Sequence, residues 1–542
     1  MIARSLLIKI QYKMRNLCFF SFLLLTFAGE NHVFKHKNKD MRKLLIFIAL
    51  FTTIAVQAQR IGCVVHSGDR SATRAEYNVL PEPRDFDPQV TYRQPVVLIS
   101  FNDQDFSMSD PKAYYNRLLN ENGFNSGSGP GCAAEYFREQ SGGRLNLQFD
   151  VYGPFKVDEK AGGHGYRYFG DDVMRGALVQ LRETETTDFS IYDWDRDGKV
   201  DQVLFVAAGY DGQQKTGYIY PHTGSFVGRL PGDIYLSFAS FTSELWQDGS
   251  LYGFGTLVHE FCHCLGLPDV YPMTGDMFSI VDEWDLMDGG NYTNKGWCPP
   301  YLSAMEKMYL GWDQPEELTE PTTITGMKPV SAGGKTYIIR NSGNPDEYYL
   351  LENRRQKGWD YSCPGNGLLI YHVDYLKSVW RNNEVNISNE HYRYDLFHAD
   401  KKDYYDWDPD SKGKDPNKYT MPDNMRSSYL STSSYPYTNP VTLAVNDGLT
   451  DTSSPAATLI TPAADGRLFM GKSITNIRLA DDGTISFDFM KDVASAITAT
   501  QALAAPDAWY TLDGRRLTGE PATKGLYIRR SATGQSRVTL VP

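Results

Sequence analysis

The thirteen residues from His259 to Tyr271, HEFCHCLGLPDVY, constrain the fold of this chain more than any other stretch. A helix is expected from about Gly255 to Leu265, because after its first residue this stretch has neither Pro nor Gly. Residues four apart lie on one helix face, so His259 and His263 turn their imidazoles toward the same point. Two such rings can bind one zinc ion, and Glu260 beside the first is placed to take a proton from a zinc-bound water.

The third ligand is expected from the turn that ends this helix. Gly266 lets the chain reverse sharply, because it has no side chain to oppose a left-handed conformation. The reversal brings Asp269, ten residues after His259, back toward the metal. A rival ligand is Glu283, which follows His263 by twenty residues, a spacing that also occurs in zinc sites with two His and one Glu. We favour Asp269 and keep Glu283 as the alternative.

Two cysteines alternate with these histidines but are not expected on the metal. Neither Cys262 nor Cys264 has the cysteine spacing of a structural zinc site. We interpret them as small buried hydrophobic residues, or as partners in a disulfide with Cys298 or Cys132. The chain has seven cysteines in 542 residues, too few for disulfides to be its main scaffold.

A second candidate metal site is the acidic stretch DWDRDGKVD. Carboxylates at alternate positions, a glycine for the turn and a backbone carbonyl reproduce the first part of an EF-hand-type calcium loop. The twelfth position holds Leu204, where Glu is usual. A structural calcium ion is predicted here, with ligands from Asp193, Asp195, Asp197, Lys199 and Asp201.

The N-terminal region predicts export from the cell. The stretch MRKLLIFIALFTTIAVQAQ has the basic start, apolar run and small-residue ending of a signal peptide, so we take Met41 as the true start and residues 1–58 as an upstream segment plus signal peptide. Its apolar run is shorter than the roughly 20 residues that span a bilayer. No later stretch is long and apolar enough, so no transmembrane segment is expected in the mature chain.

Charge argues against a nucleic-acid partner. Loss of residues 1–58 removes nine basic and two acidic residues, and lowers the formal charge from −12 to −19. Nucleic-acid binding selects basic surfaces, whereas an acidic surface suits solubility outside the cell and the binding of hard cations.

The rest of the chain divides into segments with different patterns of apolar and polar residues. Strand patterns at 95–101, 145–157 and 200–209, with a helix over 132–143, fit an α/β (α+β) catalytic domain. Short alternating runs after Trp312 fit a β-rich, sandwich-like domain. The expected order is a short leader or propeptide (59–90), the catalytic domain (91–312), the β-rich domain (313–490), a linker (491–507) and a small C-terminal β unit (508–542).

Several stretches together resemble the immune inhibitor A family of secreted bacterial zinc metallopeptidases. They are the HExxHxxGxxD helix, the acidic loop, and AAEYFREQSGGRLNLQFDVYGPF, EYYLLENRR and PGNGLLIYHVDY, across roughly residues 90 to 380. The resemblance implies a metzincin-like fold, with zinc on His259, His263 and Asp269 and with Glu260 as general acid/base. It also implies that Met287, in a Gly-rich turn, forms an apolar floor beneath the ligands. The sequence departs from the metzincin pattern in having Asp269 where His is usual, and the leader is very short.

Both ends of the mature chain carry further hypotheses. The stretch YTLDGRRLTGEPATKGLYIRR resembles the sorting tails of Bacteroidetes proteins exported by a type IX system, which implies that secretion machinery recognises residues 508–542. The alternative is a last β-hairpin with an Asp-Gly turn. Near the other end, Cys63 is a candidate fourth zinc ligand that keeps the enzyme latent, or a disulfide partner or incidental thiol.

The sequence thus predicts a secreted or surface-associated zinc endopeptidase that acts on extracellular proteins or peptides. Zinc would polarise the scissile carbonyl, Glu260 would move the proton, and Tyr292 is a candidate donor to the oxyanion. One alternative is a non-catalytic surface protein whose β-rich part binds host glycan or protein. Another is a zinc amidase that acts on non-protein amides.

Overall fold

The computed structural model describes residues 79–127, 129–165, 168–272, 280–388, 391–402, 407–408, 419–420, 429–491, 508–511, 517, 521–530 and 536–541. The predicted signal peptide, Cys63 and most of the predicted linker lie outside these ranges. Within them, no helix has both the length and the apolar character that crossing a membrane requires.

A five-stranded sheet carries the candidate site. Its order is β2-β1-β3-β5-β4, in which β4 is an antiparallel edge strand and the other four run parallel. The strands are β1 (Thr91–Phe101), β2 (Asn146–Val157), β3 (Lys199–Tyr210), β4 (His222–Arg229) and β5 (Tyr235–Leu245). Central strand β3 is buried almost throughout, as expected of a parallel strand covered on both faces. The strands predicted at 95–101, 145–157 and 200–209 are confirmed.

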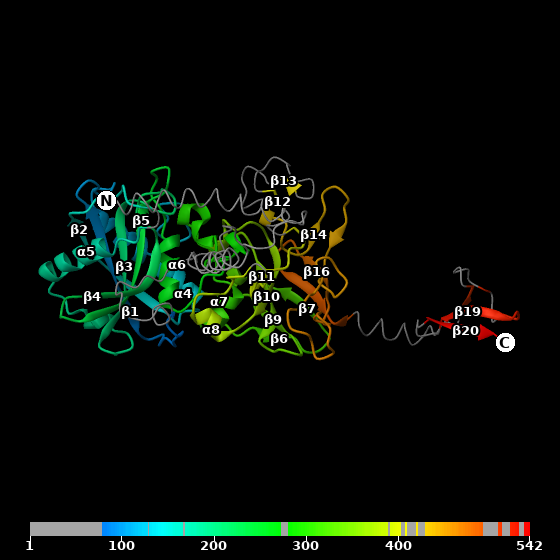
Figure 1. Cartoon of the computed structure of the whole chain (residues 1–542). Helices are drawn as coiled ribbons and strands as arrows, with labels where there is room; N and C mark the ends of the chain where they lie inside the picture. The colour runs from blue at the N-terminus through cyan, green and yellow to red at the C-terminus, as the bar shows by residue number, and fades with distance from the viewer. Residues whose placement is uncertain are drawn as a thin grey trace, which may run out of the picture. The chain divides into compact units, whose positions relative to one another are not determined.

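Helices cover both faces of this sheet, and Figure 1 shows α5 and α6 on opposite sides of the strands. Successive residues of β1 point to opposite faces. Val97 and Ile99 pack with the α5 side, whereas Val96 and Leu98 pack with the α4 and α6 side. The helices are α3 (Pro111–Asn120), α4 (Ala133–Gln140), α5 (Asp171–Thr184) and α6 (Gly255–Cys264), with 3-10 turn η1 (Phe189–Tyr192). Helix α4 confirms the helix predicted over 132–143.

Two further sheets form a sandwich in the second half of the chain. The first has the order β11-β10-β9-β8-β6 and the second β16-β17-β7. They share a core that includes Ile339, Leu351 and Phe487. The strands are β6 (Glu316–Glu317), β7 (Thr322–Met327), β8 (Tyr337–Arg340), β9 (Glu347–Arg354), β10 (Gly367–Asp374), β11 (Tyr394–Leu396), β16 (Ile474–Leu479) and β17 (Ile485–Phe489).

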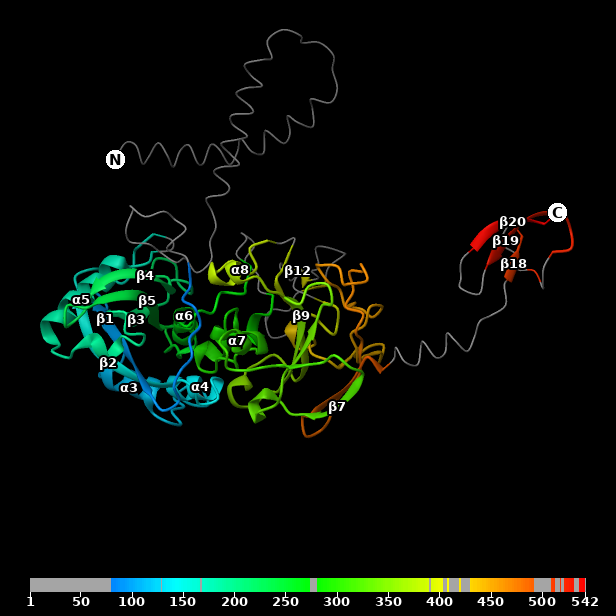
Figure 2. The ribbon, with the colours of Figure 1, turned by 90° about the horizontal axis from the view of Figure 1, so that it is seen from below.

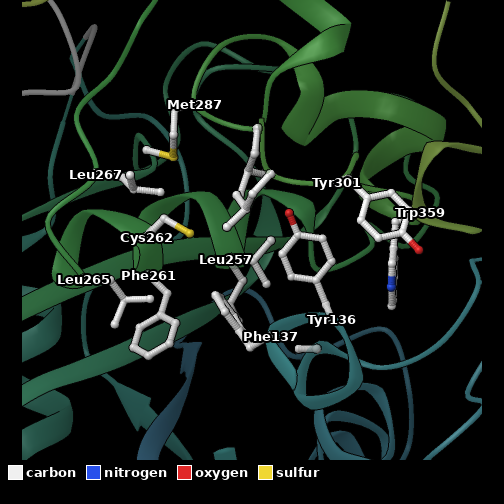
Figure 3. Packing of buried hydrophobic residues seen from close by; sticks show 14 of the residues in the cluster. Tyr136, Phe137, Leu257, Phe261, Cys262, Leu265, Leu267, Met287, Tyr301 and Trp359 are labelled. Atoms are coloured by element: carbon white, nitrogen blue, oxygen red, sulfur yellow. The ribbon is translucent and has the colours of Figure 1, made fainter. Parts of the chain in front are cut away.

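Strand β9 of the first sheet is buried on both faces. All eight residues of β9 are buried, and Tyr348 and Leu350 belong to the same hydrophobic cluster as Tyr136 of α4 and Phe261 of α6. In the same cluster the rings of Tyr136 and Trp359 pack edge to face at 5.1 Å (Figure 3). The hydrophobic core therefore continues across residue 312, where the composition of the sequence changes.

Shorter elements complete the structure, and Figures 1 and 2 label α7, α8 and β12 among them. They are α7 (Ala304–Tyr309), α8 (Lys377–Arg381), η2 (Asp282–Trp284), η3 (Gly290–Gly296), η4 (Val330–Ala332), η5 (Gly358–Asp360), β12 (Trp407–Asp408), β13 (Tyr419–Thr420), β14 (Tyr437–Thr438) and β15 (Val445–Asn446). At the C-terminus, β18 (Ala508–Tyr510), β19 (Gly525–Arg530) and β20 (Ser536–Val541) form an antiparallel sheet of their own. The structure is thus of mixed α/β class, consistent with an α+β fold.

Residues 79–87 form an extended segment that we call the N-terminal strap. Leu80 and Phe86 are buried, and the Leu80 amide donates to the Arg381 carbonyl at 2.8 Å. Glu82 pairs with Arg381, and Arg84 pairs with Asp201 at 2.6 Å. This part of the predicted leader is thus packed against both halves of the chain.

Candidate metal site

The end of α6 explains why the chain turns back toward its own histidines. The amide of Leu267 donates to the Cys262 carbonyl and that of Gly266 to the His263 carbonyl, both at 3.0 Å. These two bonds, with Gly266 in a left-handed conformation (φ +104°), form a Schellman motif. A Cβ at Gly266 would lie 2.6 Å from the Pro81 carbonyl of the strap. Only glycine fits this turn, which directs the following residues to the helix face that carries the histidines.

His259, His263 and Asp269 meet at one point. Asp269 Oδ1 lies 3.2 Å from His259 Nε2 and 3.3 Å from His263 Nε2. All three side chains are buried, and each offers a donor atom within 4.8 Å of the others. Donors bound at about 2.0 Å to a tetrahedral zinc ion lie roughly 3.3 Å apart, so the observed spacing fits that ion.

Among the residues that the structure describes, two of these atoms have no hydrogen-bond partner. His263 Nε2 and Asp269 Oδ1 are buried polar atoms without one, which is costly unless a cation or water satisfies them. Burial alone would lower the pKa of His259, but Asp269 and Glu260 outweigh it and raise the pKa to about 9. Burial would raise the pKa of Asp269, yet the charges of His263 and His259 hold it below its usual value. The donor set therefore favours positive charge at its centre.

Backbone carbonyls orient both imidazoles. His259 Nδ1 lies 2.9 Å from the Leu286 carbonyl, and His263 Nδ1 lies 2.7 Å from the Leu267 carbonyl. Only a protonated nitrogen can donate to a carbonyl, so each Nδ1 carries hydrogen in these bonds. The neutral ring then presents the Nε2 lone pair to the centre of the site, the tautomer that metal binding requires.

Glu260 lies beside the donor set and is hydrogen-bonded by residues of strands β4 and β5. Thr223 of β4 donates to Glu260 Oε2 or to the Glu260 carbonyl, each at 2.8 Å, and Ser240 of β5 lies 3.2 Å from that carbonyl. Glu260 is 2 % exposed, and burial raises the pKa of its carboxyl. A buried carboxylate with a raised pKa can accept and return a proton near neutral pH.

The turn that contains Met287 supports the site through its backbone. The Met287 carbonyl accepts from the amide of Val270, the residue after Asp269, at 3.1 Å, and the Leu286 carbonyl orients His259. The Met287 side chain is fully buried in the cluster that includes Cys262 and Leu267 (Figure 3). The role of Met287 as an apolar floor beneath the ligands stays a prediction.

The cysteines of α6 are buried thiols in this structure. Cys262 and Cys264 are free, as are the three other described cysteines, Cys132, Cys298 and Cys363. Burial raises the pKa of Cys262 well above its usual value and that of Cys264 to about 12. The structure thus favours small buried hydrophobic residues over the alternative of a disulfide.

Two other candidates lie outside the donor set. Glu283 is in η2 and does not belong to the group of His259, His263 and Asp269. Tyr292 is in η3, where its hydroxyl donates to Gln213 Oε1 and its ring lies 6.0 Å from that of Trp246.

The acidic loop brings together three of its five predicted ligands. Asp193, Asp195 and Asp197 offer carboxylate oxygens within 4.8 Å of one another. Asp201 is outside this group, since its two oxygens accept from Arg84 and from the amide of Trp194, both at 2.6 Å.

The three grouped carboxylates also order the loop backbone. Asp193 accepts from the amides of Asp197 and Gly198 at 3.1 and 2.9 Å. Lys199, the fifth predicted ligand, begins β3 and donates its amide to Asp197 at 2.8 Å.

Sequence reasoning missed Thr223 and Asn383. They lie 37 and 114 residues from the groups they contact, Glu260 and Asp269. No local pattern marks either residue, because only the folded chain brings them to the site.

No protein-family model matches the sequence, and no curated protein matches it either.

Proposed function

We propose that this chain is a secreted zinc-dependent endopeptidase with a metzincin-like catalytic domain. The observation that carries the proposal is the buried group of His259, His263 and Asp269, with Glu260 adjacent on the same helix. Donor type, donor spacing and two unsatisfied donor atoms all suit zinc.

In this proposal the three donors hold the ion and leave one position open. Bound zinc supplies a Lewis acid that polarises the substrate carbonyl and lowers the pKa of a coordinated water. Glu260 takes the proton of the attacking water and returns it to the leaving amine. Thr223 orients the Glu260 carboxylate, and the low exposure of the site strengthens every electrostatic interaction within it.

A peptide substrate is supported by the place of β4 in the sheet. Among the described strands, β4 pairs with β5 alone, so its other edge can accept an extended chain. Thr223 belongs to β4 and contacts Glu260, so a peptide added at this end of the strand would pass the catalytic carboxylate.

The remaining parts of the proposal concern export and calcium. The N-terminal signal, the acidic mature chain and the tail at 508–542 support export, with secretion machinery as partner and extracellular proteins or peptides as substrates. Calcium, if bound, would take Asp193, Asp195 and Asp197 in a structural role.

The test compares four forms of the mature chain, residues 59–542. Wild type and Glu260→Ala should contain equal zinc, because Glu260 is not a ligand, while hydrolysis of an unfolded protein should fall by about 10²- to 10⁴-fold in Glu260→Ala. Asp269→Ala should lose zinc. The matched control is Glu283→Ala, which removes the rival carboxylate and should keep zinc and activity.

Each result bears on one step of the proposal. Activity retained by Glu260→Ala would exclude its role in proton transfer. Zinc lost in Glu283→Ala but kept in Asp269→Ala would assign the third ligand to Glu283. A wild type that holds zinc and cleaves no protein, with its fold intact, would favour the amidase or the binding protein.

A further inference from the structure

Beyond these roles, we propose that Asn383 is a positioning residue for the metal-binding carboxylate of Asp269. Asn383 follows α8, in the half of the chain that the sequence separates from the catalytic domain. The inference rests on the proposed function, because it assigns to Asn383 the task of fixing one zinc ligand.

Asn383 and Asp269 form two hydrogen bonds. The Asp269 amide donates to Asn383 Oδ1 at 2.6 Å, and Asn383 Nδ2 donates to Asp269 Oδ2 at 2.8 Å. The first bond fixes the orientation of the amide, since an oxygen must face the Asp269 N–H and the NH₂ group must face the carboxylate. The second occupies Oδ2 and leaves Oδ1 for the point where His259 and His263 converge.

The backbone of Asn383 is suited to this contact. Its φ is +53°, in the left-handed region that Asn adopts more readily than most residues. Its side chain is buried, with 6 % exposure, so water competes little for either bond. Both features restrict the amide to one arrangement, as a group that orients a ligand requires.

A second asparagine holds the next residue of the same loop. Asn386 Nδ2 donates to the Val270 carbonyl at 2.6 Å and to the Tyr394 carbonyl at 2.8 Å. Asn383 and Asn386 therefore hydrogen-bond to Asp269 and Val270 from outside the segment predicted as the catalytic domain. Of the two asparagines, only Asn383 contacts the ligand carboxylate. Loss of either side chain should therefore affect the stability of the loop, but only loss of Asn383 should act on metal binding directly.

The experiment uses the mature chain, residues 59–542, and the variant Asn383→Gly. Glycine tolerates the left-handed backbone and removes both hydrogen bonds without adding strain. The matched control is Asn476→Gly on β16, where the native Asn476 has the same φ of +53°. This variant also loses one bond to a carboxylate, from Asn476 Nδ2 to Asp488 Oδ2 at 2.9 Å. Thermal unfolding of the metal-free proteins shows whether each variant is folded.

Zinc affinity is measured by competition with a chromophoric chelator, and the ligand field by the visible spectrum of the Co²⁺-loaded protein. For Asn383→Gly we expect the zinc Kd to rise by about 10- to 100-fold and the Co²⁺ bands to shift. Asn476→Gly should match the wild type in both. Should Asn383→Gly fail to fold, Asn383→Ser takes its place, since a serine hydroxyl is too short to make both bonds.

The outcomes separate this inference from the function it rests on. A folded Asn383 variant with wild-type zinc affinity and Co²⁺ spectrum overturns the role of Asn383, while a wild type that cleaves protein keeps the proposed function. Equal weakening in Asn476→Gly also overturns it, because the effect would then be general. A wild type that binds no zinc overturns the inference and the proposed function together.

Discussion

On strand β9, Arg354 is a fully buried cation beside two carboxylates. It donates to Asp360 at 2.5 and 2.7 Å and to Glu352 at 2.9 Å, and also to the carbonyls of Trp284 and Tyr301. Breaking such a pair costs about 3–5 kcal/mol, because the remaining charge stays buried. Arg354 therefore ties strand β9 to the turn that precedes Met287.

Asp285 and Glu306 share a second buried site, and among the described residues neither forms an ion pair with a basic side chain. Burial raises the pKa of both carboxyl groups, and that of Glu306 stands well above its usual value, also because Asp285 is close. Asp285 accepts from the amide of Met287 at 2.9 Å, so this pair supports the same turn. Glu306 therefore keeps its proton to a higher pH in the folded chain than in the unfolded chain.

The variant Glu306→Gln should change how stability depends on pH. In the wild type the folded pKa lies above the unfolded one, so the contribution of Glu306 is complete below about pH 4.5 and is lost as pH rises toward the folded pKa, with a slope of at most about 1.4 kcal/mol per pH unit. A neutral amide has no such loss. Urea unfolding at pH 5, 7 and 9 should show Glu306→Gln gaining stability over the wild type as pH rises.

The control for this prediction is Glu316→Gln, the same substitution at an exposed carboxylate paired with Lys335. It should leave the pH dependence nearly unchanged, because exposed pairs contribute little. A difference between wild type and Glu306→Gln that stays constant from pH 5 to 9 would contradict a raised pKa for Glu306.

At the scale of elements, the sequence predicts best where one local pattern decides the structure. The helix α6, its end at Gly266 and the return of Asp269 all follow from spacing within a few turns of chain. The strands β1, β2 and β3 follow from runs of apolar residues bounded by polar ones. Pairing of Asp201 with Arg84 of the strap was not predictable, because sequence spacing alone favoured Asp201 as a calcium ligand.

The end of α6 supports a prediction for Gly266→Ala. Alanine would meet the Pro81 carbonyl at 2.6 Å and would adopt φ +104°, so the turn must shift and move Asp269 with it. We expect a loss of unfolding free energy greater than the roughly 1–2 kcal/mol of left-handed strain alone, together with weaker zinc binding. Chemical unfolding and zinc competition measure the two effects.

Gly123→Ala is the matched control for the turn. Gly123 also has positive φ (+72°), but apart from its chain neighbours no atom of the described residues lies within 4 Å of its added Cβ. It should show the strain without the loss of zinc affinity. Equal zinc affinity in Gly266→Ala and Gly123→Ala would mean that the Asp269 loop does not depend on this helix end.

For the whole molecule, the sequence predicts the kinds of element better than their association. The change near Trp312 from mixed to β-rich texture is present, since the sandwich of β6 to β17 begins there. Composition could not reveal that β9 is buried on both faces. The residues that cover it come from distant parts of the sequence, so only the folded chain shows that its polar positions are buried too. Glu352 and Arg354 look like surface residues in EYYLLENR, yet each is fully buried, where Arg354 pairs with Glu352 and donates to carbonyls of the first half.

A shared core predicts that the two halves unfold together. Residues 59–491 keep every described element through β17 and should give one transition in calorimetry, with the same midpoint by tryptophan fluorescence and zinc release. The fragment 91–312 loses Arg354 and Asn383 and exposes the apolar face that packs on β9 and β10, so we expect no cooperative unfolding and no tight zinc site. Two separate transitions, or a fragment that binds zinc as tightly as residues 59–491, would show that the catalytic segment folds without the second half.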